Sequence, residues 1–241
     1  MNYRLDGDGD RVVVLSGSLG ATLEMWEPQL PPLSARFRVL RYDHPGHGGS
    51  PPLAESSVSS MARAVVKLLD ELGIPRVSYC GLSLGGAVGM RLALDAPERV
   101  EKLVLCSTSA RFATPGLWQE RADRVRRDGV AAIVDTVLER WFTPAFRDVR
   151  RYSEMLLSIP SEGYARACEA VRDWDARGEL HGISAPAFAI AGAEDPSTPP
   201  SDLEAIVEEI PGAELLVVDD ARHLVNVERA GEFNEAVLAH L

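Results

Sequence analysis

The sequence Gly81-Leu82-Ser83-Leu84-Gly85 lies between two apolar runs and decides the fold. The preceding run, residues 76–80, has the composition of a buried strand, and residues 86–94 have that of a packed helix. Gly-x-Ser-x-Gly between a strand and a helix predicts a sharp turn with the serine at its apex. Glycines suit such a turn because a Cβ would crowd the strand and the helix. We therefore expect a strained backbone at Ser83 that exposes its hydroxyl above a sheet, as in serine hydrolases.

Strand-like and helix-like runs alternate along most of the chain, which predicts a parallel sheet with helices on both faces. Apolar runs predict buried strands at residues 12–15, 38–41, 76–80, 103–106, 187–191 and 215–218. A further strand at residues 3–5 is expected to pair with residues 12–15. Helices are predicted at residues 57–72, 84–95, 201–210 and 231–240.

Residues 111–181 interrupt this alternation. They predict consecutive amphipathic helices at residues 117–127, 130–141, 146–158 and 163–174, with Pro115, Pro144 and Pro160 between or beside them. Helices inserted between two strands of a sheet form a cap over it. We therefore predict a core domain of residues 1–110 and 182–241, of the α/β-hydrolase fold with a mostly parallel central sheet, and an inserted helical cap of residues 111–181.

The formal net charge of −11 argues against binding to nucleic acid or to an anionic membrane surface. The charge is uneven, because residues 111–179 contain 12 Arg and 12 Asp plus Glu and are neutral as a whole. Surface helices with many ion pairs explain most of these arginines. The alternative is a neutral, arginine-rich segment that accepts an anionic substrate.

Three cysteines, Cys80, Cys106 and Cys168, lie far apart and match no metal-binding spacing. The first residues show no apolar signal region, and no apolar stretch approaches the roughly 18 residues of a membrane span. We expect a reduced, cytoplasmic setting.

A serine hydroxyl needs a base to take its proton and a third group to orient that base. Among the histidines after Ser83, His223 follows the strand at residues 215–218 and falls at the same sheet edge as Ser83. His181 precedes a strand, at the opposite edge, and His240 is the penultimate residue. His223 is therefore the predicted base.

Asp195 directly follows the strand at residues 187–191, again at the carboxyl edge where open α/β sheets place their sites. It is the predicted acid. Glu194, Asp219 and Asp220 are the alternatives, although the last two suit turn hydrogen bonds.

The oxyanion of an acyl-transfer reaction needs two backbone N–H donors. Leu84 follows the nucleophile and begins a helix whose dipole favours negative charge. Leu19, in the loop at residues 16–20, is the expected second donor, with the Ser18 side chain beside it. The alternative is a tight glycine turn without a catalytic part. His44 and His47 are a weak metal signal, and a structural turn near the site is the favoured interpretation.

Over nearly its whole length the chain resembles the 3-oxoadipate enol-lactonases, α/β-hydrolases of aromatic-acid breakdown. The matching residues are 18–20, 25–26, 38–43, 46–48, 81–83, 85–86, 97–100, 139–144, 190–192, 195, 198–200, 223–224 and 226–228. The Arg-Trp-Phe-Thr-Pro sequence at residues 140–144 and the loop from Ser-Leu-Gly at residues 18–20 to Met-Trp at residues 25–26 are more specific than the other matches. Two departures are Pro45, where the family usually has arginine, and Gly17, where asparagine is common.

The resemblance implies Ser83 as nucleophile, Asp195 as acid and His223 as base, with no metal or organic cofactor. It also implies that Arg140 and Trp141 face a small-molecule lactone, with the Arg140 guanidinium pairing with its free carboxylate. The expected reaction opens 3-oxoadipate enol-lactone to 3-oxoadipate through an acyl-enzyme. The alternatives are a carboxylesterase or a carbon–carbon bond hydrolase with the same triad, and a binding protein of this fold without turnover.

Overall fold

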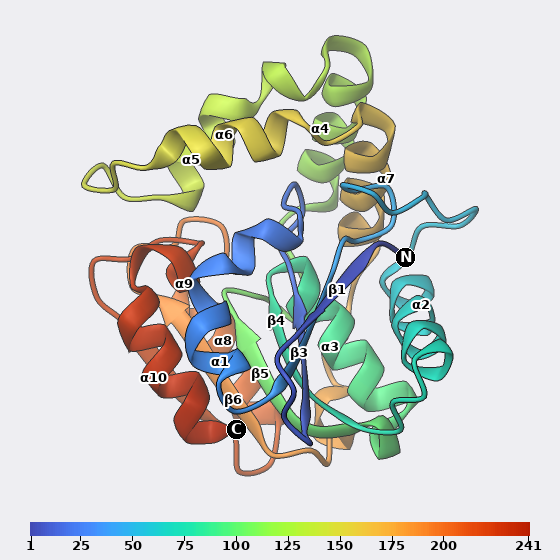
Figure 1. Ribbon diagram of the computed structural model, residues 1–241. Helices are drawn as coiled ribbons and strands as arrows, with labels where there is room; N and C mark the ends of the chain where they lie inside the picture. Colours follow the sequence, from blue (N-terminus) through green and yellow to red (C-terminus); the bar gives the residue numbers. More distant parts are fainter.

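A seven-stranded sheet in the order β1-β3-β2-β4-β5-β6-β7 forms the centre of the computed structural model, which describes residues 1–241 (Figure 1). All neighbours are parallel except β1, which pairs antiparallel with β3. The strands are β1 (Tyr3–Asp6), β2 (Val12–Ser16), β3 (Arg38–Tyr42), β4 (Val77–Leu82), β5 (Val100–Cys106), β6 (Ala187–Gly192) and β7 (Glu214–Val218). The predicted mostly parallel sheet is therefore confirmed.

The predicted pairing of β1 was wrong. Residues 3–5 do not pair with β2, because both edges of β2 are occupied by the parallel strands β3 and β4. β1 instead adds to the free edge of β3, with Tyr3 opposite Tyr42. The short loop after β1 suggested a local hairpin with β2, but β3 lies between β1 and β2 in the sheet.

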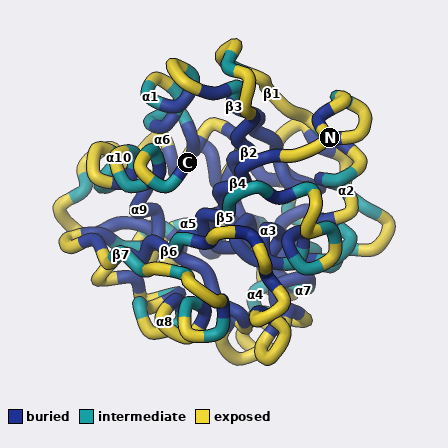
Figure 2. The backbone as a smooth tube through the Cα atoms, turned by 90° about the horizontal axis from the view of Figure 1, so that it is seen from below, coloured by how far each residue is buried: buried dark blue, intermediate teal, exposed yellow.

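Helices cover both faces of the sheet: α1 and α10 pack on one face, and α2, α3 and α8 on the other (Figure 2). In chain order the helices outside residues 115–172 are η1 (Leu23–Gln29), α1 (Leu30–Ser34), α2 (Val58–Glu71), α3 (Leu84–Asp95), η2 (Pro97–Arg99), η4 (Leu180–Gly182), α8 (Pro200–Glu209), α9 (Val225–Glu228) and α10 (Ala230–His240). None of the helices combines the length and the apolar character needed to cross a membrane.

Four helices lie together above the carboxyl edge of the sheet (Figure 1). They are α4 (Pro115–Asp128), α5 (Val134–Trp141), α6 (Val149–Leu157) and α7 (Ser161–Arg172), with the short turn η3 (Val130–Ala132) before α5. We call residues 115–172 the cap segment. The helix expected at residues 130–141 is broken at Ile133, whose φ of −121° is not helical. The helix expected at residues 146–158 begins only at Val149, because Phe146 stacks on Phe142 instead.

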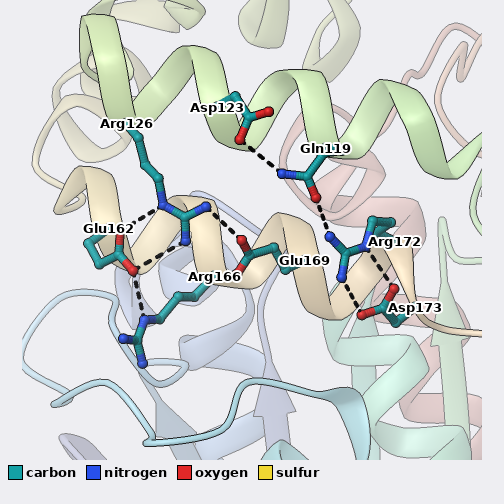
Figure 3. A network of polar contacts seen from close by, with 8 residues as sticks. All are labelled: Gln119, Asp123, Arg126, Glu162, Arg166, Glu169, Arg172 and Asp173. Carbon is teal, nitrogen blue, oxygen red and sulfur yellow. Dashed lines mark hydrogen bonds and ion pairs between the residues drawn. The ribbon is translucent and has the colours of Figure 1, made fainter.

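The cap segment is held by both polar and apolar contacts. Arg126 on α4 reaches Glu162 and Glu169 on α7, at 2.9 and 2.6 Å (Figure 3). The main hydrophobic cluster of 71 buried residues contains cap residues such as Val125 and Leu156 together with the strands of the sheet. The cap helices are therefore packed into the same core as the sheet.

Two glycines bring the cap segment against the core with backbone touching backbone. Gly46, in the turn after β3, has a φ of +79°, and its peptide lies against Gly163 in the first turn of α7. A Cβ on Gly163 would overlap the carbonyl group of Gly46. Only glycine fits at this approach, although alanine is the better helix former elsewhere.

We predict that Gly163→Ala destabilises the protein by about 1–3 kcal/mol, because overpacking at the backbone contact exceeds the gain in helix propensity. Gly116→Ala is the matched control, since Gly116 also lies in a cap helix but a Cβ there meets nothing within 4 Å. The control should be neutral or stabilising by up to about 1 kcal/mol. Urea unfolding measures both, and a Gly163→Ala variant as stable as the wild type would contradict the contact.

Candidate active site

Ser83 stands at the turn between β4 and α3 in a backbone conformation that L residues rarely adopt. Its φ is 58° and its ψ is −114°. The Ser83 N–H donates to the Cys106 carbonyl at 2.9 Å, and Thr108 Oγ1 donates to the Ser83 carbonyl at 2.8 Å. These bonds to the next strand hold the strained turn, as the sequence predicts.

Gly81 and Gly85, on either side of Ser83, must be glycines because other backbone atoms lie where a Cβ would be. A Cβ on Gly81 would overlap the Gly85 carbonyl, and a Cβ on Gly85 would overlap the Ser16 carbonyl at the end of β2. The Gly85 N–H also donates to the Gly17 carbonyl at 3.0 Å. The turn is therefore bound to the loop that follows β2.

Asp195, after β6, and His223, after β7, form a buried pair at the same edge of the sheet. Asp195 Oδ2 accepts a hydrogen bond from His223 Nδ1 at 2.7 Å. It also accepts from Thr198 Oγ1 at 2.7 Å, and Oδ1 accepts from the Ser197 and Thr198 N–H groups at 2.8 and 3.2 Å. Burial alone would raise the pKa of Asp195, but the charge of His223 and these hydrogen bonds hold the pKa below its usual value.

The alternative acids and bases lie elsewhere. Glu194, Asp219 and Asp220 are exposed, and Asp220 pairs with Arg229 at 2.6 Å. His181 is exposed, and His240 stacks on Phe188 at the end of α10. The structure therefore brings only Asp195 and His223 together.

A cavity of about 340 Å³ lies between the carboxyl edge of the sheet and the cap segment, and it is lined by most of the predicted site residues. Ser83 and His223 face it from the core, together with Ser18 and Leu19. Arg140 and the buried Trp141 face it from α5. No hydrogen bond joins Ser83 Oγ to His223, and catalytic hydrogen bonds of this kind often tighten only when substrate binds.

The two predicted oxyanion donors, the N–H groups of Leu19 and Leu84, lie on different segments of the core. Leu19 lines the cavity, and its N–H donates to no group of the protein. Leu84 is buried as the first residue of α3, where an N–H has no acceptor within the helix. Both are on the segments that the Gly85–Gly17 hydrogen bond joins.

Arg121 on α4 is a cavity residue that sequence reasoning missed. Eight of the arginines from residue 111 to residue 177 form salt bridges, but Arg121 and Arg140 do not. Both line the cavity, and no Asp or Glu side chain lines it with them. Burial, and next the positive charge of Arg121, lower the pKa of Arg140. Two cations facing one cavity without a counter-ion create a positive potential that favours an anion.

The loop that carries His223 is bound to the cap segment through Glu228. Glu228 Oε1 accepts from the N–H and the hydroxyl of Thr143 at 2.8 and 2.7 Å. Its Oε2 accepts from the Arg222 N–H at 2.7 Å. In addition, the Leu224 N–H donates to the Trp141 carbonyl at 3.1 Å. The end of α5 and the His223 loop are therefore joined by a set of hydrogen bonds.

Hydrogen bonds hold the turn at residues 43–50 in place. Asp43 accepts hydrogen bonds from the Leu23 and Gly49 N–H groups at 2.8 and 2.9 Å. His44 and His47 are fully buried, and the side chains of this chain form no group of three or more possible metal ligands.

Comparison with known proteins places the chain in a family. The model of the α/β-hydrolase fold matches residues 10–230, and the chain belongs to that family. It is 38% identical to 3-oxoadipate enol-lactonase 2 of Acinetobacter baylyi, over 99% of this chain and 92% of that protein. The solved enol-lactonase of Burkholderia xenovorans LB400 is 38% identical with a TM-score of 0.95, covering 99% of this chain and 95% of that one. A hydrolase from Pseudomonas aeruginosa PA01 is 41% identical with a TM-score of 0.95, covering 99% of this chain and 92% of that one.

The resemblance to the enol-lactonases that the sequence indicated is thus confirmed. The protein is an enzyme, a carboxylic ester hydrolase similar to the 3-oxoadipate enol-lactonases.

The buried histidines predict how stability depends on pH. Burial lowers the pKa of His44 from 6.5 to about 4 and that of His47 from 6.5 to about 3. The unfolded chain therefore binds more protons than the folded chain below the unfolded pKa of about 6.5. The free energy of unfolding should be at its full value above that pH and fall as the pH drops towards 4.

Urea unfolding between pH 7.5 and pH 4 measures this fall. A His44→Gln/His47→Gln variant is the control, because glutamine does not titrate. Its free energy of unfolding should change less steeply below pH 6.5, and parallel curves for the two proteins would contradict the assignment.

Proposed function

We propose that the protein hydrolyses 3-oxoadipate enol-lactone to 3-oxoadipate, with Ser83, His223 and Asp195 as catalytic triad. The observation that carries the proposal is the cavity itself, where Ser83 and His223 face two arginines that no carboxylate neutralises. A substrate with a reactive ring carbonyl and a separate carboxylate fits both halves of that cavity. The similarity to proteins named 3-oxoadipate enol-lactonases supports the same substrate.

In the first half of the reaction, His223 Nε2 takes the proton of Ser83 Oγ as this oxygen attacks the ring carbonyl. Asp195 holds the opposite nitrogen of the imidazole, at 2.7 Å, and stabilises the imidazolium that forms. The Leu19 and Leu84 N–H groups bind the oxyanion. The ring C–O bond then breaks, His223 returns its proton to the enolate oxygen, and the enol becomes the ketone.

In the second half, water releases the opened acyl chain, which still carries the new ketone, from Ser83. His223 takes a proton from the water as its oxygen attacks the acyl carbonyl of the ester with Ser83. The bond to Ser83 Oγ breaks, His223 returns the proton to that oxygen, and the dicarboxylate product leaves. Neither half requires a metal or an organic cofactor.

Recognition of the substrate is assigned to the cap segment. Arg140 and Arg121 bind the free carboxylate, and charge-assisted hydrogen bonds to guanidinium give this contact its strength. Trp141 and Ser18 complete the wall of the cavity on either side of the reacting carbonyl. The substrate is thereby fixed at two points, the ring at Ser83 and the carboxylate below the cap.

Replacing Ser83 with alanine tests the nucleophile. We expect kcat to fall by at least about 10³-fold, because the remaining triad members act only through the serine. Thermal stability should stay close to that of the wild type or rise, since alanine is no more strained than serine at this position. A fluorophosphonate should label the wild type and not the variant. Turnover retained by Ser83→Ala would refute the assignment, and a folded wild type that resists labelling would favour a binding protein.

Replacing Arg140 or Arg121 with alanine tests the substrate class. We expect kcat/KM for the enol-lactone to fall by about 10- to 100-fold, the effect of losing about 1.5–3 kcal/mol of charge-assisted hydrogen bonding. For a neutral aryl ester the change should stay within about threefold. Arg147→Ala is the matched control, because Arg147 is an exposed cap arginine outside the cavity. Equal losses for charged and neutral substrates, or a wild type that prefers neutral esters, would point to a carboxylesterase or a carbon–carbon bond hydrolase.

A further inference from the structure

Two buried histidines that the proposed mechanism does not use hold the two ends of the loop that carries Leu19. We infer that His44 and His47 are positioning residues, which orient the Leu19 N–H for the oxyanion. The inference rests on the proposed acyl transfer at Ser83, but it does not depend on which lactone or ester is the substrate.

His44 holds the beginning of the loop. Its Nε2 lies 2.9 Å from the Gly17 carbonyl oxygen, which can only accept. Nε2 must therefore carry the proton, and Nδ1 is left buried without a partner. The same carbonyl accepts from the Gly85 N–H at 3.0 Å. Gly17 is thus fixed between the nucleophile turn and His44.

His47 holds the end of the loop in the opposite way. Its Nε2 accepts from the Gly20 N–H at 3.1 Å, so this nitrogen must be unprotonated. The proton is on Nδ1, which faces the Pro45 carbonyl at 3.4 Å. Gly20 has a φ of +85°, which glycine adopts as readily as a negative φ, and the hydrogen bond to His47 fixes its peptide in this one conformation.

With the loop held by these two hydrogen bonds, the Leu19 N–H is left free to bind the oxyanion. The Ser18 N–H faces Met25 Sδ at 3.3 Å, the Gly20 N–H donates to His47, and the Ala21 N–H donates to the Ser18 carbonyl at 3.1 Å. Among these four consecutive residues only Leu19 keeps an N–H without an acceptor in the protein, and Leu19 lines the cavity. A donor held in place before substrate arrives costs no reorganisation during the reaction.

His47 must be neutral for this arrangement, whereas the hydrogen bond that His44 donates requires only the proton on its Nε2. His47 accepts a hydrogen bond at a nitrogen that would be protonated in the cation. Their rings lie 6.3 Å apart, and each is enclosed in the core of the protein. A polar network continues below them, because Ser16 Oγ lies 2.6 Å from Tyr42 OH and 3.4 Å from His44 Nε2. The loop is therefore tied into the interior of the sheet.

The test compares variants that keep or remove each hydrogen bond. Glutamine places its terminal amide near the position of Nε2 and can donate or accept there, whereas phenylalanine keeps the ring and loses the bond. With p-nitrophenyl acetate, His44→Phe and His47→Phe should each lower kcat by about 10- to 100-fold, less than the roughly 10²–10³-fold for removal of an oxyanion donor. KM should change by less than about threefold, and the glutamine variants should recover most of the activity.

A second measurement separates positioning from general damage to the fold. The affinity for a boronic acid that forms a tetrahedral adduct with Ser83 should fall in each phenylalanine variant by the same factor as kcat/KM. The affinity for 3-oxoadipate, whose carbonyl carbons are all trigonal and form no oxyanion, should stay unchanged. A phenylalanine variant with wild-type kcat, or one whose boronate affinity is unchanged while kcat falls, would overturn the inference.

If the phenylalanine variants do not fold, His44→Asn and His44→Gln make the same test. Asparagine places its amide near Nδ1 and not near Nε2, so only the glutamine variant should be active. Equal activity of these two variants would overturn the inference. The use of a simple aryl ester keeps this result independent of whether the enol-lactone is the substrate.

Discussion

The backbone of Ser83 is the constraint on which the site depends. A positive φ at a residue with a side chain costs about 1–3 kcal/mol and persists only where the surroundings enforce it. Here Cys106, at the end of β5, and Thr108 hold the backbone of Ser83 through hydrogen bonds. On the other side, Gly85 packs closely against Ser16 at the end of β2. The parallel order β2-β4-β5 is therefore what keeps the serine in place. The same contacts set the distance between the turn and the loop of Leu19.

The sheet could be predicted from the sequence because its inner strands are buried on both faces. Such strands are continuous apolar runs, and β2, β4 and β6 are fully or almost fully buried along their length. β1 is exposed, and its partner is decided by which edge of the sheet is free. That is a property of the assembled sheet. The break at Ile133 and the late start of α6 likewise depend on packing within the cap segment.

The candidate site likewise contains residues that could be predicted from the sequence and one that could not. Ser83, Asp195 and His223 each follow a recognisable strand, and parallel strands bring their carboxyl ends to one edge. Arg121 has no such signal, because in the sequence it resembles the arginines that the structure shows to be ion-paired. What distinguishes Arg121 is the absence of a carboxylate within its cavity, which depends on how α4 and α5 meet above the sheet. The division into a core and a cap at residues 111 and 181 stays a prediction, since the two share one hydrophobic cluster.

The carboxylate of Glu228 has a consequence for engineering. When related proteins share a fold, the cap of one can be replaced by the cap of another in order to change the substrate specificity. In this protein a foreign cap would have to supply both donors of Thr143, or Glu228 would lose two of its three hydrogen bonds. The loss would reach Arg222 and the neighbouring His223 through the other oxygen. A chimera that ignores this junction would thus be defective in its base even if its new binding surface were well formed, so the residues from Trp141 to Thr143 should be exchanged together with the loop they contact.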